Sequence, residues 1–71
     1  MIPPVTSVIT TLQKDKHNVI LIVEELSSMG LLVRNQQIHL GWFAEESDRD
    51  VKYDMIKNSF ASGSLVEVDN S

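Results

Sequence analysis

Few side chains in this sequence could do chemistry, and the two histidines are the first to consider. His17 and His39 are the only histidines, and the chain has no cysteine. A zinc site takes three or four ligands and normally starts from a closely spaced pair, which this sequence does not offer. Asp15 lies beside His17 as in an acid–base pair, but a polar turn would leave both in solvent. His39 alternates with Ile38 and Leu40, so we expect it to point away from the core. The sequence predicts no metal and no cofactor.

The remaining groups that could support catalysis are serines and carboxylates. No serine lies in a Gly-x-Ser-x-Gly turn, and three glycines cannot form a glycine-rich phosphate loop. Carboxylates are adjacent at Glu24–Glu25 and Glu45–Glu46. Neighbouring residues on a helix do not face each other, so the first pair cannot act as a dyad. The second pair fits the start of a helix, where negative charge is stabilising. Because no catalytic constellation emerges, we predict that the protein is not an enzyme.

Length places residues 1–71 in one small domain with a thin margin of stability. Disulfides are excluded, so good packing or a partner must supply the stability, and a homodimer is one candidate. The chain opens without the basic and apolar segments of a secretory signal. Its longest apolar run, Val19 to Val23, is far below the roughly 20 residues of a membrane span. We expect a cytoplasmic protein with no membrane partner.

The acidic charge is concentrated in the last third of the chain. The net charge is −4, and residues 1–44 contribute three basic and three acidic side chains, which cancel. Residues 45–71 hold three basic and seven acidic side chains, which leaves −4. An acidic domain repels the phosphate backbone unless basic residues cluster locally. Charge therefore disfavours nucleic acid as a partner.

Two helices are expected in the first thirty residues. For the first, over residues 5–13, the apolar spacing is helical and prolines suit its start: Pro3, Pro4, Val5, Val8, Ile9 and Leu12. The many β-branched residues there leave a strand as the alternative. The second follows Asn18 as N-cap and ends at Gly30, with apolar residues at helical spacing: Val19, Ile22, Val23, Leu26 and Met29.

Strands, a third helix and a last strand are expected in the rest. Residues 31–43 change to strand periodicity, with a polar break at residues 35–37 that reads as a hairpin turn. Ser47 or Asp48 can cap a helix whose apolar face is Val51, Met55, Ile56 and Phe60. Residues 65–68 are strand-like and should pair with the hairpin edge, while residues 68–71 should fray. The fold class is α+β: two N-terminal helices, a β-hairpin, a third helix and a short C-terminal strand, with a small antiparallel sheet packed on the helices.

Residues 18–41 carry a further pattern. Helical apolar spacing runs from Val19 to Met29, Gly30 follows, and two strand-like segments come next, Leu31–Arg34 and Ile38–Gly41. This order resembles the recognition helix and wing of winged-helix DNA-binding proteins, and the resemblance implies a DNA-binding transcriptional regulator. The sequence departs from that family where base edges would be read, since basic or amide side chains are needed there. The positions are occupied by Glu24, Glu25, Ser27 and Ser28.

An aromatic pair stands before the acidic stretch. Trp42 continues the inward alternation and is expected in the core, which places Phe43 on the opposite face. Exposed aromatics rimmed by charge are common at protein-binding surfaces. Phe43 is therefore either an apolar anchor for a partner or a cover for the sheet edge beneath the third helix. The predicted partner-binding residues are Phe43, Glu45, Glu46, Asp48 and Asp50.

Three functional hypotheses follow. The first is a small, non-catalytic regulatory or inhibitory protein, encoded by a phage or a bacterium, that binds another protein and sets its acidic patch against a basic target. The second is the winged-helix-like DNA-binding regulator. The third is a structural accessory subunit of a larger assembly. Retention on nucleic acid and its dependence on salt separate the first from the second.

Overall fold

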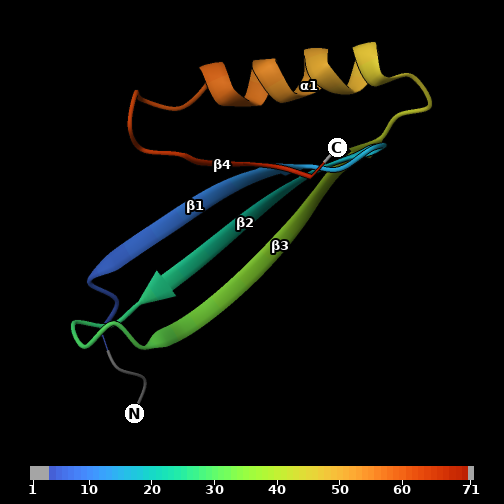
Figure 1. Cartoon of the computed structure of the whole chain (residues 1–71). Coiled ribbons are helices and arrows are strands. Elements are labelled where there is room, and N and C mark those ends of the chain that lie inside the picture. Colours follow the sequence, from blue (N-terminus) through green and yellow to red (C-terminus); the bar gives the residue numbers. More distant parts are fainter. Residues whose placement is uncertain (1–3, 71) are drawn as a thin grey trace.

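The computed structural model describes residues 4–70 and has one helix and four strands in this part of the chain (Figure 1). The elements follow the order β1 (Ser7–Lys14), β2 (Asn18–Leu26), β3 (Leu32–Trp42), α1 (Glu46–Asn58) and β4 (Val66–Asp69). They form one sheet with strand order β3-β2-β1-β4. The β1–β2 and β2–β3 pairs are antiparallel, whereas β4 pairs with β1 in parallel. The result is a small α+β protein with a mixed sheet.

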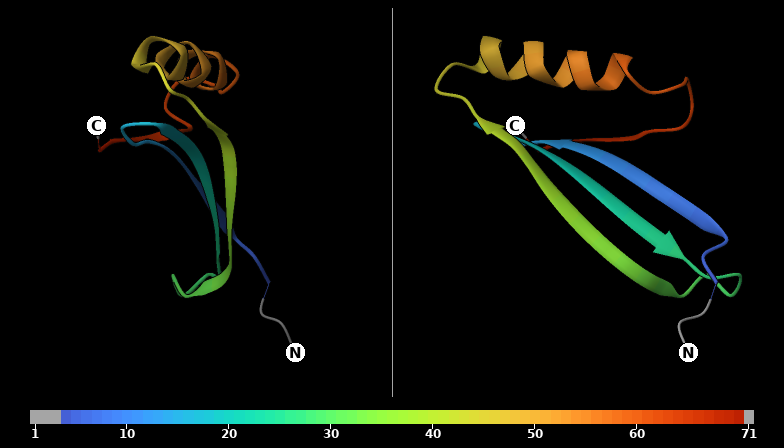
Figure 2. Two further views of the ribbon diagram at one scale, coloured as in Figure 1. Left: turned by 90° about the vertical axis from the view of Figure 1, so that its right-hand side faces the viewer. Right: turned by 180° about the vertical axis from the view of Figure 1, so that it is seen from behind.

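The helix covers only one end of this sheet. In Figures 1 and 2, α1 lies across the end where β3 leads into it, and the three long strands continue well beyond it. We call this projecting part, residues 7–11 and 22–37, the arm. The molecule is elongated, with extents of 45 × 22 × 16 Å and a radius of gyration of 13.8 Å. A compact domain of this length would have a radius of about 11 Å.

The core is correspondingly small and lies under the helix. Its buried hydrophobic residues are Leu12 of β1, Val19 of β2 and Tyr53 of α1. Partly buried side chains pack around them: Leu21, Leu40, Phe43, Ile56 and Leu65. Leu12 and Leu21 face each other across the β1–β2 pair, so their side chains share the face that α1 covers. Burial of apolar surface therefore stabilises mainly this end of the sheet.

The two expected N-terminal helices are wrong. Residues 7–14 are β1, which was the alternative for that segment, and residues 18–26 are β2. β-branched residues make up four of the eight residues of β1 and four of the nine residues of β2, and these lose less rotamer freedom in a strand than in a helix. Both faces of β2 are partly buried, so its sequence shows no clear alternation of apolar and polar residues. Its apolar residues happened to satisfy a helical spacing as well.

The hairpin turn expected at residues 35–37 is also misplaced, because these residues lie inside the continuous strand β3. The reversal occurs at residues 27–31 instead. There the buried Ser27 hydroxyl accepts hydrogen bonds from the backbone N–H groups of Met29 and Leu31, both at 3.3 Å. Gly30 adopts a φ of 76°, a conformation that glycine enters without steric cost. The turn thus uses the glycine that had been assigned to the end of a helix.

β3 is irregular near its end, and as a result the expected burial of Trp42 and Phe43 is exchanged. The register with β2 shifts between Val19 and Ile20, and Gly41 has a φ of 153°. A Cβ atom on Gly41 would lie 2.9 Å from Cζ of Phe43, so the Phe43 ring occupies the space that glycine leaves. Phe43 consequently packs against the core, while Trp42 is 63% exposed. The expectation that Trp42 lies in the core is wrong, and the edge-covering interpretation of Phe43 holds.

α1 is present where a third helix was expected, but it starts at Glu46 and presents a different face. Glu45 is the N-cap residue and makes no side-chain capping hydrogen bond, so neither Ser47 nor Asp48 caps it. Arg49 and Tyr53 are buried against the sheet, and Ile56 is partly buried beside them. Val51 and Met55, expected on the buried face, are exposed. The helix is therefore rotated relative to the predicted apolar face.

The C-terminal strand is present as β4, but its partner differs from the expectation. It pairs with β1 rather than with the edge of the β2–β3 hairpin, and Leu12 lies opposite Glu67. The pairing reaches into the segment that was expected to fray, since the Asn70 N–H donates to the Lys14 carbonyl at 2.8 Å. Pro3 and Ser71, which also figured in the expectations, lie outside the described residues.

Candidate functional site

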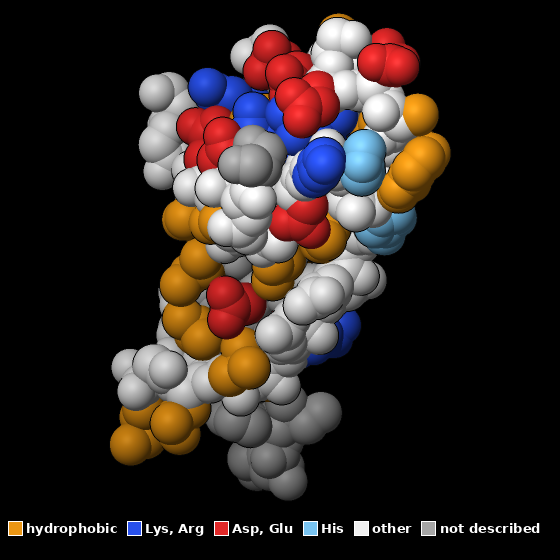
Figure 3. All heavy atoms as spheres, turned by 45° about the vertical axis from the view of Figure 1, so that its right-hand side comes forward, with side chains coloured by type: hydrophobic (Ala, Val, Ile, Leu, Met, Phe, Trp, Pro, Cys, Tyr) orange, Lys and Arg blue, Asp and Glu red, His pale blue; other side chains and the backbone are white. Residues whose placement is uncertain are grey.

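Charged side chains gather at the helical end of the molecule (Figure 3). Arg49 of α1 connects several parts of this end. Arg49 is only 4% exposed. Its guanidinium donates to the carbonyl oxygens of Asp15 and Lys16 in the β1–β2 turn, at 3.0 and 3.2 Å. It also donates to Oδ1 of Asp50, from Nε at 3.1 Å and from Nη2 at 2.8 Å. Arg49 therefore fixes the turn to the helix.

Asp50, one of the predicted partner-binding residues, is occupied within the molecule. Besides Arg49, it pairs with Lys14 at 3.5 Å. The hydrogen bond from Arg49, together with the positive charges of Arg49 and Lys14, lowers the pKa of Asp50 below its ordinary value. Lys14 also lies 3.8 Å from Asp69 and 4.9 Å from the centre of the Tyr53 ring. Asp50 is thus a member of an internal charge network.

The other three predicted acids are available for contact. Glu45, Glu46 and Asp48 are exposed at the start of α1. Within residues 4–70, none of them is within ion-pair distance of a basic side chain. Their charge is favourable next to the positive end of the helix dipole, so it costs the fold little. Three of the four acids predicted to bind a partner are thus exposed close together in the chain, whereas Asp50 is engaged within the molecule.

Trp42 is the aromatic residue that accompanies the patch, in place of Phe43. Its ring lies 5.4 Å from the His17 ring, centroid to centroid, at an interplanar angle of 33°. His17 is itself held by two contacts with the backbone of Phe43. Its Nδ1 lies 2.9 Å from the Phe43 carbonyl, and its own carbonyl accepts the Phe43 N–H at 2.7 Å. Trp42 is therefore exposed, and its ring contacts the His17 ring, which is held in place by the Phe43 backbone.

Each histidine is within hydrogen-bond distance of a neighbouring residue in the structure. His17, expected on a solvated surface, is half-buried, and His39 is exposed with its Nε2 2.7 Å from Oδ1 of Asn18. Asn18 had been assigned to a helix cap, but it sits at the start of β2 opposite Trp42. Among the described residues, no group of three or more metal-ligating side chains could hold an ion. The histidines thus shape the surface around Trp42.

A second feature of this end joins α1 to β4 through Tyr53. The Tyr53 hydroxyl donates to Oε1 of Glu67 at 2.8 Å, and Lys57 lies 3.5 Å from the same oxygen. Burial of the ring, the hydrogen bond to Glu67 and the surrounding negative charges raise the pKa of Tyr53 above its ordinary value. The same hydrogen bond, with the charge of Lys57, lowers the pKa of Glu67. These groups stabilise the contact between helix and strand.

The raised pKa of Tyr53 predicts a loss of stability in alkaline solution. Above pH of about 10 the unfolded chain ionises its tyrosine while the folded chain keeps it neutral, so the free energy of unfolding falls as pH rises. Tyr53 is the only tyrosine, so tyrosinate absorbance reports on it directly. We expect native Tyr53 to titrate later than free tyrosine and Tyr53→Phe to abolish this loss of stability. Native titration at the ordinary value would contradict the prediction.

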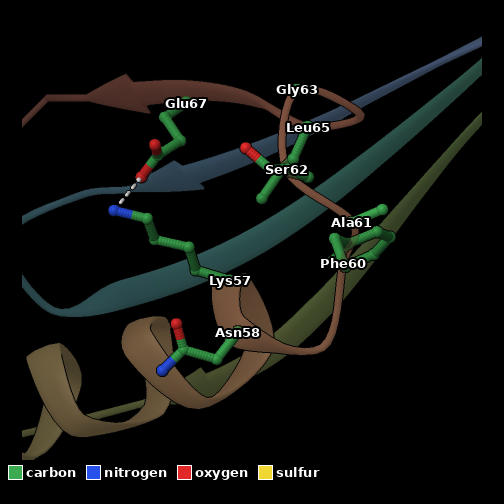
Figure 4. A pocket seen from close by; sticks show the side chains of 8 residues that line it. All are labelled: Lys57, Asn58, Phe60, Ala61, Ser62, Gly63, Leu65 and Glu67. Atoms are coloured by element: carbon green, nitrogen blue, oxygen red, sulfur yellow. Dashed lines mark ion pairs between the residues drawn. The ribbon is translucent and has the colours of Figure 1, made fainter.

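A hollow of about 320 Å³ lies between the end of α1 and the segment leading to β4 (Figure 4). The ion pair between Lys57 and Glu67 crosses one side of it, and Phe60 and Leu65 supply apolar surface. Ser62 is the hydroxyl residue in its lining, and no histidine lines it.

What this end of the molecule offers is an exposed tryptophan and a patch of free carboxylates. The exposure of Trp42 was not predicted, because the irregularity at Gly41 shifts the alternation of side chains along β3. The burial of Arg49 was not predicted either, although its position four residues before Tyr53 places both on one face of the helix. No helix in the described part of the chain is long and apolar enough to cross a membrane. Comparison of the chain with protein-family models, with curated proteins and with solved structures found no match.

Proposed function

We propose that this chain is a small, non-catalytic regulatory or inhibitory protein that binds another protein at its helical end. The binding surface would consist of Trp42 with Glu45, Glu46 and Asp48, and the target would present an apolar pocket edged by basic residues. The observation that carries the proposal is the exposure of Trp42 a few residues before three exposed carboxylates that have no ion-pair partner in the described residues.

The two parts of this surface would contribute differently. Tryptophan is enriched among the residues that dominate binding energy, because it buries a large rigid area. The ring contact with His17 limits the freedom that Trp42 would lose on binding. The carboxylates would instead steer a basic partner and exclude acidic ones, which acts mainly on the association rate. Trp42 would therefore mainly set the dissociation rate of the complex, and the carboxylates would mainly set its association rate.

Binding to DNA is less well supported by the same features. The resemblance to winged-helix proteins requires a recognition helix within residues 18–29, and the structure has β2 in that position. The exposed acids at the helical end would also repel phosphates. DNA binding is accordingly an alternative that the experiment must be able to detect.

The test compares capture by the wild-type chain with capture by two variants, using a lysate of the cells that encode it. Trp42→Ala should lose the partner through faster dissociation. The double reversal of Glu45→Lys with Glu46→Lys should slow association and reduce its dependence on salt. Mass spectrometry identifies the captured proteins, and surface plasmon resonance with the purified partner gives both rates.

Matched controls separate the surface from general effects. Leu31→Ala removes a similarly exposed apolar side chain from the β2–β3 turn, and Glu24→Lys with Asp54→Lys changes the net charge equally at other places. Both controls should bind as the wild type does. The proposal fails if the controls weaken binding as much as the two variants do. It also fails if the wild type binds duplex DNA at physiological salt and captures no protein.

A further inference from the structure

The outer edge of β3 is long and unpaired. β3 spans Leu32–Trp42 and is the first strand in the order β3-β2-β1-β4, so among the described strands it has a neighbour on one side only. Its backbone N–H and C=O groups on the other side form a template for another strand. The opposite edge is formed by the four residues of β4, which pair with Thr11–Lys14, and by the first four residues of β1. The free edge of β3 runs along the whole arm (Figure 1).

β3 lacks most of the features that protect natural edge strands. Such edges usually carry lysine, proline or several charges. β3 has neither lysine nor proline, and its one fully charged side chain, Arg34, pairs with Glu25 on β2 at 3.1 Å. Its centre is Asn35, Gln36 and Gln37, three exposed and uncharged amides. This edge is therefore suited to being covered by another strand.

β3 also exposes apolar side chains next to this edge, Leu32 and Ile38, which a neighbouring strand would help to shield. A sheet needs a packed hydrophobic face to be stable on its own in water. Because only three hydrophobic residues are buried in the described chain, additional burial at the arm would stabilise the fold appreciably.

The properties of β3 fit a second copy of the same chain. In an antiparallel pair about a two-fold axis, residues on one face meet residues on the same face. With the axis at Gln36, Asn35 meets Gln37 of the second copy, and side-chain amides can donate and accept across such a pair. In the same register Arg34 meets Ile38 and Leu32 meets Leu40, so no like charges are opposed.

The distribution of charge favours the same arrangement. Four units of negative charge come from residues 45–71, at the helical end, whereas residues 18–42 hold only Glu24, Glu25 and Arg34. An antiparallel pair places the two helical ends at opposite ends of the shared strands, about 30 Å apart at roughly 3.3 Å per residue. This exceeds the screening length of about 8 Å at physiological salt. The acidic ends would therefore not oppose association.

We propose that the chain forms a symmetric dimer in which the β3 strands of two copies pair antiparallel near Gln36, making one continuous eight-stranded sheet. Leu32–Leu40 is the paired segment, so Trp42 stays outside it. The dimer and the protein-binding surface are thus independent, and each can fail without the other.

The first experiment uses opposite charges at Gln37. Gln37→Lys places two like charges diagonally across the axis, and Gln37→Glu does the same with the other sign. We expect the wild type to be a dimer in analytical ultracentrifugation and each variant alone to dissociate at least 10-fold more readily. An equimolar mixture of the two variants should dimerise again. Asn58→Lys, on the helix, adds the same charge as Gln37→Lys and should leave the dimer intact.

The second experiment uses the absence of cysteine. Gln36→Cys brings two thiols together at the axis, where facing Cα atoms are about 4.5–5.5 Å apart, within disulfide range. Oxidation should cross-link this variant nearly completely, and Val51→Cys, on the exposed face of α1, should remain largely monomeric. Circular dichroism checks that each variant is folded. A wild type that stays monomeric at 100-fold the concentration used for binding overturns the proposal. So does a dimer that neither Gln37 variant weakens.

Discussion

Leu12→Ala is expected to remove a large part of the free energy of unfolding of this protein. Leu12 is fully buried and lies opposite Leu21 on β2, beneath α1. Truncating such a side chain removes its burial and leaves a cavity, which together cost about 2–5 kcal/mol. A chain of this length has a total free energy of unfolding of roughly 4–10 kcal/mol. Urea denaturation followed by circular dichroism measures the loss.

The control for Leu12 lies four residues earlier on the same strand and face. Val8 is 56% exposed because it sits on the arm, where α1 does not reach. Val8→Ala should change the free energy of unfolding by less than about 1 kcal/mol. Equal losses for the two variants would show that α1 does not define the core.

The second large effect is expected for Arg49→Met, which keeps the length of the side chain and removes its donors. The carbonyl oxygens of Asp15 and Lys16 then lose their partner, and Asp50 loses its strongest hydrogen bond. These hydrogen bonds are partly buried, so losing their donors is destabilising and the urea midpoint should fall. Hydrogen exchange should also accelerate in the β1–β2 turn, where Asp15 N–H donates to the Asn18 carbonyl.

Arg34→Met is the matched variant for this prediction. Arg34 makes one ion pair, with Glu25, and its side chain is 69% exposed. Exposed ion pairs contribute little to stability, so this variant should denature close to the wild type. If Arg49→Met and Arg34→Met have the same midpoint, the contacts of Arg49 with the turn are not structural.

The elements that the sequence located correctly are those set by local chemistry. The polar turn between Lys14 and Asn18 and the helix that begins within the acidic residues 45–48 are both present, because charge and turn-forming residues act over a few positions. The start and the buried face of the helix were less accurate. The face was misjudged because Arg49, a charged residue, takes a core position by satisfying carbonyl oxygens rather than by being apolar.

The elements that the sequence missed depend on distant partners. Val19 and Ile22 fit a helical spacing and a strand equally well, and only pairing with both β1 and β3 decides for the strand. The exposure of Trp42 depends on the register shift against β2 and on the room that Gly41 leaves for Phe43. The patch of Glu45, Glu46 and Asp48 could be predicted, but its aromatic partner could not.

The two neighbours of β1, strands β2 and β4, are expected to pair with it at different stages of folding. Leu12 meets Leu21 through a short turn, but it meets Glu67 only after β3, α1 and the connecting loops are in place. Contacts close in sequence form early, whereas distant ones must first overcome the entropy of closing a long loop. The meander of three strands should therefore form first, and α1 and β4 should close over it in a slower step. Until that step the edge of β1 is bare, so the chain is most open to pairing with other chains during this interval.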